Sequence, residues 1–450
     1  MAANASAARA WPGYTAVWRW HFYAGLFCIP FVLWLAVTGS VYLFKPQIEA
    51  LIDRPYADVA AATGPRASAA RQAAAAVAAV PGSVLHRYQL PDTPTQAVQV
   101  IVGAGRQETR VYVHPQTLAV LKTVNEDQRL MRIVSRLHGE LMVGNPGSYL
   151  VELAASWAIV MILSGLFLWW PRGRGPAGVV WPRVSAGGRR FWRDLHAVAG
   201  FWVSLMALFL LLSGLPWAKS WGSYLKVVRA AVEGQPARQD WTTGRSGELS
   251  ARASADAGTR AMLDEHAEHG GMTMAHPAAP YVPLDRLVAA VAPLRLAGPV
   301  LIAPPTGPGQ PWTAKSDAAN RPHRTDLTLD PASGAILTRT DFSQRRLVDR
   351  LVGYGIAVHE GALFGWLNQL LNLVTALGLI LVSVSGVVMW WRRRPTGTLG
   401  APVVRDGPPL AKAFFALVIA LGVTLPLFGA SLLAVIGGDV ALRRLRRPTA

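Results

Sequence analysis

Two kinds of histidine recur in this 450-residue sequence at matching distances from a hydroxyl-bearing residue followed by glycine. His21 and His196 each begin a His-x-x-Ala-Gly motif and precede such a pair by 17 positions. His138 and His359 each precede a Ser-Gly pair by 26 positions. The sequence has only ten histidines, so chance does not explain this coincidence, which indicates an internal repeat.

Two imidazoles that face each other can supply both axial ligands of a six-coordinate haem iron, a site better suited to electron transfer than to oxygen binding. If the chain crosses a membrane, repeats related by an axis along the membrane normal bring equivalent residues face to face. This arrangement pairs His21 with His196 and His138 with His359. A helix rises about 1.5 Å per residue, so 17 residues span about 25 Å and the two pairs form separate sites.

Two glycines and the single cysteine bear on the kind of haem. Gly25 and Gly200 lie one helical turn beyond His21 and His196, where we expect them to pack against a porphyrin. Cys28 is the only cysteine, so the chain has no Cys-x-x-Cys-His attachment motif. We therefore predict two haem b groups, held without covalent bonds, one near each face of a membrane.

Three other interpretations of the histidines stay open. A histidine at the mouth of a membrane span is often an interfacial anchor and nothing more. Zinc would need a third or fourth ligand beside each histidine pair, which Glu140 and Glu360 could supply. Histidines inside a membrane can also relay protons.

The composition indicates a membrane protein, because 52% of the residues are hydrophobic and only 16% are charged. Five apolar stretches approach or exceed the roughly 20 residues that a bilayer requires. These predicted spans are residues 20–44, 149–170, 193–217, 367–391 and 413–436. Pro426, with Gly422 and Gly429 nearby, leaves open whether the last stretch crosses once or forms a hairpin.

The net charge of +18 does not indicate a nucleic-acid partner, because the arginines lie beside the spans and form no basic domain face. They fill the loop after the second span and follow the fourth span as Arg392, Arg393 and Arg394. By the positive-inside rule these ends are cytoplasmic. The long segments between spans then lie outside, in the periplasm of a bacterium whose inner membrane holds the chain.

Each long segment combines one helical stretch with alternating apolar runs that are typical of strands. We therefore expect an α-helical integral membrane protein with two small extracytoplasmic α+β domains, residues 45–125 and 218–345. Interfacial helices at 126–148 and 346–366 would connect them to the next spans. The remaining segments are the cytoplasmic N-terminus 1–19, the loops 171–192 and 392–412, and the basic tail 437–450.

The second outer segment carries an insertion, residues 234–280, that the first lacks. Imidazoles and thioethers together favour copper, so the insertion could bind it, or it could be a histidine-rich linker. Its candidate ligands are His266, His269, Met272, Met274 and His276. Three further histidines, His86, His114 and His323, have no counterpart in the other repeat and are expected on the solvated surface.

These motifs together resemble the PepSY-associated transmembrane proteins, also called iron-regulated membrane proteins. "WHFYAGLF" and "LHAVAGFW" resemble the family's first-span motif, and "LHGELMVG" and "VHEGALFG" its second histidine motif. "SGLFLWWPR" and "SGVVMWWRRRP" resemble its span endings, and "LTLDPASGAIL" resembles the PepSY strand-turn-strand. The first outer segment departs from this pattern, with "HPQTLAVL" in place of the Asp-Pro and glycine.

The resemblance implies a tandem span–PepSY–span architecture and two b-type haems on His21, His138, His196 and His359. It also implies an enzyme, a reductase that passes electrons to a periplasmic ferric siderophore or similar metal chelate and releases reduced iron. No nucleotide fingerprint is present, so a separate cytoplasmic flavin or NAD(P)H reductase, or quinol, would donate the electrons. The rival hypothesis is a non-enzymatic PepSY membrane protein that binds or senses periplasmic copper or regulates a peptidase.

Overall fold

The computed structural model describes residues 13–62, 64–104, 107–171, 177–234, 281–306, 309–402 and 412–445. The chain divides into two units, each assembled from separate stretches of sequence. The helical unit comprises Met1–Val41, Ser135–Thr242 and Leu370–Ala450. The sheet unit comprises Tyr42–Val134 and Thr243–Gln369.

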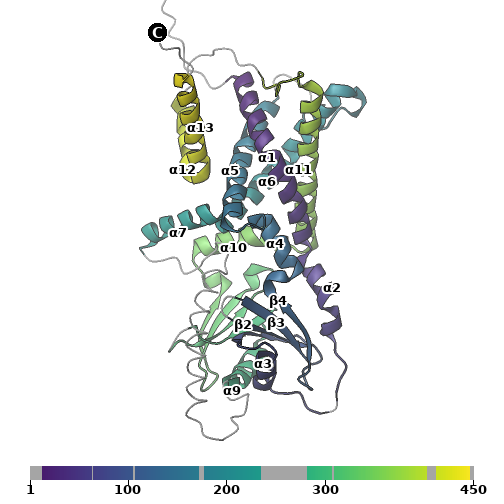
Figure 1. Ribbon diagram of the computed structural model, residues 1–450, viewed down its shortest axis with the longest axis vertical. Coiled ribbons are helices and arrows are strands. Elements are labelled where there is room, and N and C mark those ends of the chain that lie inside the picture. The colour runs from purple at the N-terminus through teal and green to yellow at the C-terminus, as the bar shows by residue number, and fades with distance from the viewer. Residues whose placement is uncertain are drawn as a thin grey trace, which may run out of the picture. The chain divides into compact units, whose positions relative to one another are not determined.

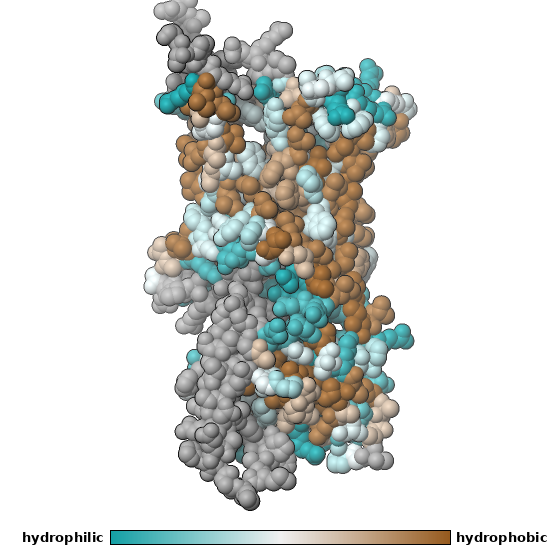
Figure 2. Space-filling model, viewed as in Figure 1, coloured by the Kyte–Doolittle hydropathy of each residue, from teal (hydrophilic) through white to brown (hydrophobic). Residues whose placement is uncertain are grey.

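Four helices are long and apolar enough to cross a membrane: α1 (Tyr14–Leu43), α5 (Asn145–Trp169), α6 (Gly188–Gly214) and α11 (Trp366–Arg393). They match the first four predicted spans (Figure 1). Large apolar side chains are exposed on them, among them Leu205 and Val374, and hydrophobic residues cover much of the helical part of the surface (Figure 2). Contact of such an apolar surface with lipid chains is favourable, whereas its exposure to water is unfavourable.

The last predicted span, residues 413–436, could cross once or form a hairpin, and the structure decides between the two. The segment forms two shorter helices, α12 (Lys412–Thr424) and α13 (Pro426–Leu445). A Cβ added to Gly429 would lie 3.1 Å from the Cα of Gly422, whereas seven residues of a continuous helix span about 10 Å. The two helices therefore fold back on each other, as the hairpin alternative had it. Pro426 causes the break, because it has no N–H for the preceding helix and favours the first position of a new one.

Shorter helices follow or precede the long ones: α2 (Lys45–Ala57), α4 (Leu130–Glu140), α7 (Lys219–Glu233) and α10 (Leu347–His359). The predicted interfacial helices correspond to α4 and α10. The predicted start of the second outer domain, residue 218, is wrong, because α7 belongs to the helical unit. There the carboxylate of Glu152 accepts hydrogen bonds from the backbone N–H groups of Ser220 and Trp221, at 2.9 and 3.1 Å, in the first turn of α7.

The sheet unit holds one continuous antiparallel sheet of eight strands, in the order β4-β3-β2-β1-β5-β6-β7-β8, where two separate small domains were predicted. The strands of the first repeat are β1 (Val84–Leu90), β2 (Val98–Ala104), β3 (Gln107–Val113) and β4 (Val120–Asn125). Those of the second are β5 (Val300–Ala303), β6 (Trp312–Ser316), β7 (Thr325–Leu329) and β8 (Ile336–Asp341). The first strand of each repeat pairs with the other, with Tyr88 opposite Ile302. Pairing these two strands removes an exposed edge from each half.

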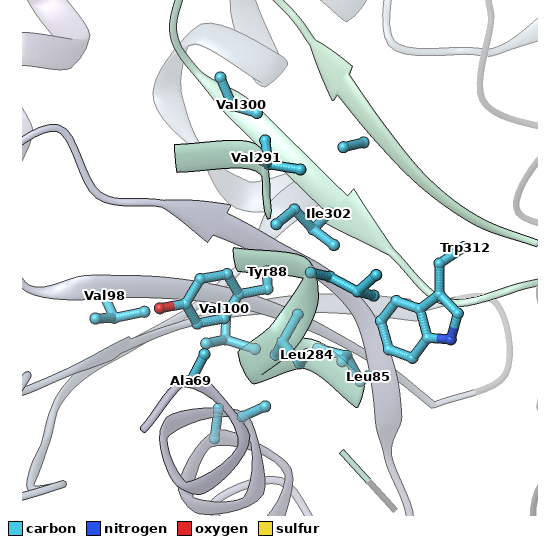
Figure 3. Close-up of a cluster of buried hydrophobic side chains, with 14 of the residues drawn as sticks. Ala69, Leu85, Tyr88, Val98, Val100, Leu284, Val291, Val300, Ile302 and Trp312 are labelled. Atoms are coloured by element: carbon cyan, nitrogen blue, oxygen red, sulfur yellow. The ribbon is translucent and has the colours of Figure 1, made fainter. Parts of the chain in front are cut away.

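One face of the sheet carries the hydrophobic core, which the helices α3 (Ala69–Ala78) and α9 (Val282–Val291) cover. Side chains of both repeats meet there, including Tyr88, Leu284 and Ile302 (Figure 3). Each of these three is at most 2% exposed, and burying an aliphatic side chain of this size contributes about 1.5–3 kcal/mol. The two halves are therefore held by a shared core as well as by strand pairing.

The strand-turn-strand of each repeat has the same backbone, although its sequence differs. In the second turn Asp330 accepts hydrogen bonds from the backbone N–H groups of Ala332 and Ser333, and Gly334 has a φ of +77°. In the first turn the ring of His114 accepts the equivalent bonds from Gln116 and Thr117. Leu118 takes the glycine position at a φ of +64°. The departure from the Asp-Pro and glycine pattern therefore leaves the turn intact.

Replacing Gly334 by alanine should destabilise the protein by about 1–2 kcal/mol, because a Cβ is strained in the left-handed region. An added Cβ would also lie 3.3 Å from the carbonyl oxygen of Arg286. We expect a lower thermal unfolding midpoint for the detergent-solubilised protein. Ala332→Ser, on the exposed part of the same turn, should leave the midpoint unchanged; equal midpoints for both variants would contradict the strain argument.

The prediction that His86 lies on the solvated surface is wrong. The side chain is 1% exposed, and its Nδ1 lies 2.9 Å from Oε1 of Glu108 on β3. The same carboxylate oxygen accepts a hydrogen bond from Arg87 at 2.9 Å. A register shift between Leu85 and Arg87 turns His86 inward at a β-bulge. Of the other two histidines, His323 is exposed and His114 is half-buried in its turn.

Candidate functional site

The helical unit brings His21 of α1 and His196 of α6 together. Their ring centroids are 6.3 Å apart and the ring planes are nearly perpendicular, at 84°. The two residues are 175 positions apart in the sequence, and the repeat predicted this pair. Both side chains are half-buried.

Hydrogen bonds to neighbouring helices orient the two rings in the same way. His21 Nδ1 lies 3.0 Å from the carbonyl oxygen of Met161 and 3.0 Å from Ser164 Oγ, both on α5. His196 Nδ1 lies 2.9 Å from the carbonyl oxygen of Val382 and 3.2 Å from Ser385 Oγ, both on α11. A carbonyl only accepts, so Nδ1 of each ring carries the proton and Nε2 has the lone pair for a metal.

The glycines that follow these serines make room for the rings. A Cβ added to Gly165 would lie 3.1 Å from Cε1 of His21, and one added to Gly386 would lie 3.4 Å from Cε1 of His196. Each imidazole therefore rests on a Ser-Gly pair of the neighbouring helix. The sequence pointed to these pairs only as markers of the repeat. Their fixed distance from a histidine was the signal that could have assigned them this role.

The two glycines predicted to pack against a porphyrin, Gly25 and Gly200, are not in close contact with other protein side chains. A Cβ on Gly25 would lie 3.8 Å from Sδ of Met161, and one on Gly200 would lie 4.0 Å from Val382. These are ordinary van der Waals distances. Packing of Gly25 and Gly200 against haem therefore stays a prediction.

The distance between the two rings suits one metal ion held between their Nε2 atoms. Metal–imidazole bonds are about 2 Å long, so an ion bound linearly by two Nε2 atoms separates the ring centres by about 6 Å. In the part of the chain that the structure describes, neither Nε2 has a hydrogen-bond partner, and no three His, Cys, Asp or Glu side chains converge as a zinc site requires. Two opposed imidazoles are the donor set of six-coordinate haem iron.

His138 lies on α4, and its ring packs against a hydroxyl-glycine pair of α1, as the rings of His21 and His196 pack against the Ser-Gly pairs of α5 and α11. Its Nδ1 lies 3.0 Å from Thr38 Oγ1, and a Cβ on Gly39 would lie 3.1 Å from its Cε1. The indole N–H of Trp34 donates to the carbonyl oxygen of Leu137 at 2.8 Å and fixes the end of α4. Burial lowers the pKa of His138 to about 4, against an opposing hydrogen bond to the backbone of Leu35. The ring is therefore neutral at physiological pH, the form that ligates a metal.

His359 is the last residue of α10 in the sheet unit. Its pairing with His138, in the helical unit, stays a prediction. Glu360 follows it, with a carboxylate oxygen 3.9 Å from the guanidinium of Arg321. Burial lowers the pKa of Arg321, and the charge of Glu360 opposes that shift. Glu140 is placed similarly, 3.9 Å from Arg136, so both glutamates have arginine partners.

The candidate copper ligands of the insertion, His266, His269, Met272, Met274 and His276, lie outside the described residues.

The tryptophans near the ends of α5 and α11 differ in exposure. Trp170 and Trp391 are exposed, at 66% and 61%, whereas Trp169 stacks on Phe201 with the ring centroids 4.0 Å apart.

Comparison with protein families gives one match that covers most of the chain. The family described as PepSY-associated TM region matches residues 18–393, which include all four repeated histidines. The comparison with curated proteins gave no match. The match covers the whole sheet and the four long helices except the first four residues of α1. The chain therefore belongs to the PepSY-associated transmembrane family and is a multi-pass membrane protein with a sheet-containing region.

Proposed function

We propose that this protein is a dihaem reductase of the bacterial inner membrane. It passes electrons to a periplasmic ferric siderophore or similar chelate and releases the iron in reduced form. The observation that carries this proposal is the facing pair of His21 and His196, whose ring centroids are 6.3 Å apart. Each ring is hydrogen-bonded through Nδ1, which leaves Nε2 as the nitrogen that could bind a metal.

His21 and His196 would hold one haem, and the bound haem would supply reversible one-electron chemistry. The carbonyl oxygens of Met161 and Val382 hold the Nδ1 protons, which fixes the tautomer that ligates through Nε2. The helices bury most of this site, and a low dielectric tunes the potential at which an electron is accepted.

A second site at the other end of the bundle supports transfer across the membrane. His138 contacts Thr38, which is 17 residues further along α1 than His21. At about 1.5 Å per residue this separates the two histidines by about 25 Å along α1, most of the thickness of a bilayer's hydrocarbon core. We propose that His138 and His359 ligate the second haem, on the strength of the sequence repeat.

The arginines indicate the direction of transfer. They follow α11 next to the end where His21 and His196 lie, and the positive-inside rule makes this end cytoplasmic. Electrons would enter here from a flavin or NAD(P)H reductase or from quinol. Each electron that leaves at the opposite, periplasmic end converts one ferric ion to the ferrous state, which binds siderophore ligands less tightly and is released.

A reduced-minus-oxidised spectrum of the purified protein tests the proposal. We expect b-type haem bands, a content of about two haems per chain, and reoxidation of the reduced protein by a ferric chelate with appearance of Fe(II). Absence of b-type bands after expression with added haem would overturn the redox function. It would favour a non-enzymatic PepSY membrane protein that binds or senses copper or regulates a peptidase.

A further inference from the structure

Two arginines at the end of α11 lie beside the helices that carry the facing histidines. The guanidinium of Arg393 is 4.6 Å from the ring centroid of Trp18 on α1, and that of Arg392 is 5.9 Å from the ring centroid of Trp192 on α6. Trp18 precedes His21 by three residues, and Trp192 precedes His196 by four. Each cation therefore contacts a tryptophan that lies about one helical turn from one histidine of the pair.

The positive charges of these two arginines are not neutralised within the described residues. The buried carboxylate of Asp194, nearby on α6, is bound by Arg183 at 2.6 Å and by Arg193 at 2.8 Å. Neither Arg392 nor Arg393 forms an ion pair in the described part of the chain; their contacts there are aromatic faces. Stacking on an aromatic ring holds a guanidinium in place. Its N–H groups point outward in the plane of the guanidinium and stay available to bind an anion.

We propose that Arg392 and Arg393 bind the two propionate carboxylates of the haem that His21 and His196 ligate. This inference rests on the proposed function. Haem has both carboxylates on one edge, and that edge turns toward the polar end of a membrane slot because buried charge is costly there. A guanidinium matches a carboxylate with two parallel hydrogen bonds, so two arginines suffice for two propionates.

The distance along α11 between the level of the histidine pair and the two arginines is suitable for this contact. His196 Nδ1 lies 3.2 Å from Ser385 Oγ, which marks the level of the histidine pair on α11. Arg393 is eight residues further toward the end of the helix, or about 12 Å. A propionate reaching outward and an arginine side chain reaching back cover such a distance together. The same cations would also suit the phosphate groups of lipids, so the experiment must separate the two anions.

The test replaces each arginine with glutamine, which removes the charge and keeps a polar side chain. Removing a cation next to the haem disfavours the added electron, so the midpoint potential of the cytoplasmic-side haem should fall. We expect a change of about tenfold in the reduction equilibrium for Arg393→Gln, or 59 mV for one electron. The haem affinity should also fall about tenfold, and Arg393→Lys should restore part of both properties. The potential of the second haem should not change.

Arg394→Gln is the matched control. Arg394 directly follows α11 and lies over Trp390 and Trp391 of that helix, 5.3 and 3.8 Å from the ring centroids. The control should retain the wild-type potential and haem content. If Arg392→Gln and Arg393→Gln behave like the control, the inference is overturned. It is also overturned if their potentials shift in vesicles with phosphatidylglycerol but not in pure phosphatidylcholine, because lipid phosphate would then be the anion bound. Absence of haem from the wild-type protein would refute the proposed function itself.

Discussion

His21→Ala and His196→Ala should each reduce the haem content of the purified protein from about two per chain to about one. Each substitution would remove one of the two imidazoles that we propose hold this haem, and a single imidazole would hold it less tightly. Losing even an outer partner of a metal ligand typically costs 10–100-fold in affinity, so loss of the ligand itself should cost at least as much. The pyridine haemochrome assay gives the haem content, and redox titration shows which of the two potentials disappears.

The control for this pair is His323→Ala, which removes an exposed histidine from the sheet unit. Its haem content should equal that of the wild type. Two haems with unchanged potentials in His21→Ala would show that this residue is no ligand, and the interfacial-anchor interpretation would then gain support. His138→Ala should remove the other potential, which distinguishes the two sites.

Valine at Gly165 or Gly386 should also weaken haem binding at the His21–His196 pair, although neither glycine is a proposed ligand. An added Cβ would lie 3.1 Å from Cε1 of His21 in one case and 3.4 Å from Cε1 of His196 in the other. The branched methyl groups of valine extend further, so the ring must leave the carbonyl oxygen that orients it. We expect the occupancy of this site to fall about tenfold, measured by haem titration of the apoprotein.

Two further substitutions give this experiment its contrast. Gly437→Val on α13, where an added Cβ meets nothing within 4 Å, should retain full haem content. Gly25→Ala has room against the protein, because the nearest atom would be Sδ of Met161 at 3.8 Å. Loss of haem in Gly25→Ala would therefore assign this glycine to the porphyrin surface. Full occupancy in Gly165→Val would contradict the role given to the Ser-Gly pairs.

Features set by local sequence were predictable. The first four spans follow from runs of apolar residues, since a helix in lipid satisfies its own backbone hydrogen bonds. The pairing of His21 with His196 followed from the repeat, since duplicated segments related by an axis along the membrane normal place equivalent residues opposite each other. The hairpin of α12 and α13 was one of two alternatives, because Pro426 predicts a break but not the direction of the chain after it.

Features that depend on distant contacts were not predictable. Pairing of β1 with β5 joins strands more than 200 residues apart, and nothing in either strand distinguishes a partner in the same repeat from one in the other. His86 was assigned to the surface because it has no counterpart in the other repeat. A bulge between Leu85 and Arg87 turns it inward to Glu108, which reverses that assignment.

The sequence by itself determined that the chain crosses a membrane several times, that it is a tandem repeat, and which histidines form the two equivalent pairs. Those conclusions depend on hydropathy and spacing, which need no knowledge of neighbouring segments. Only the tertiary structure decided that the two outer halves share one sheet, that Ser164 and Ser385 hold the histidine rings, and that Arg392 and Arg393 contact Trp192 and Trp18 on the helices that carry the pair. These are contacts between side chains or strands on different elements, and helix packing and strand register, which the sequence specifies only collectively, bring them together.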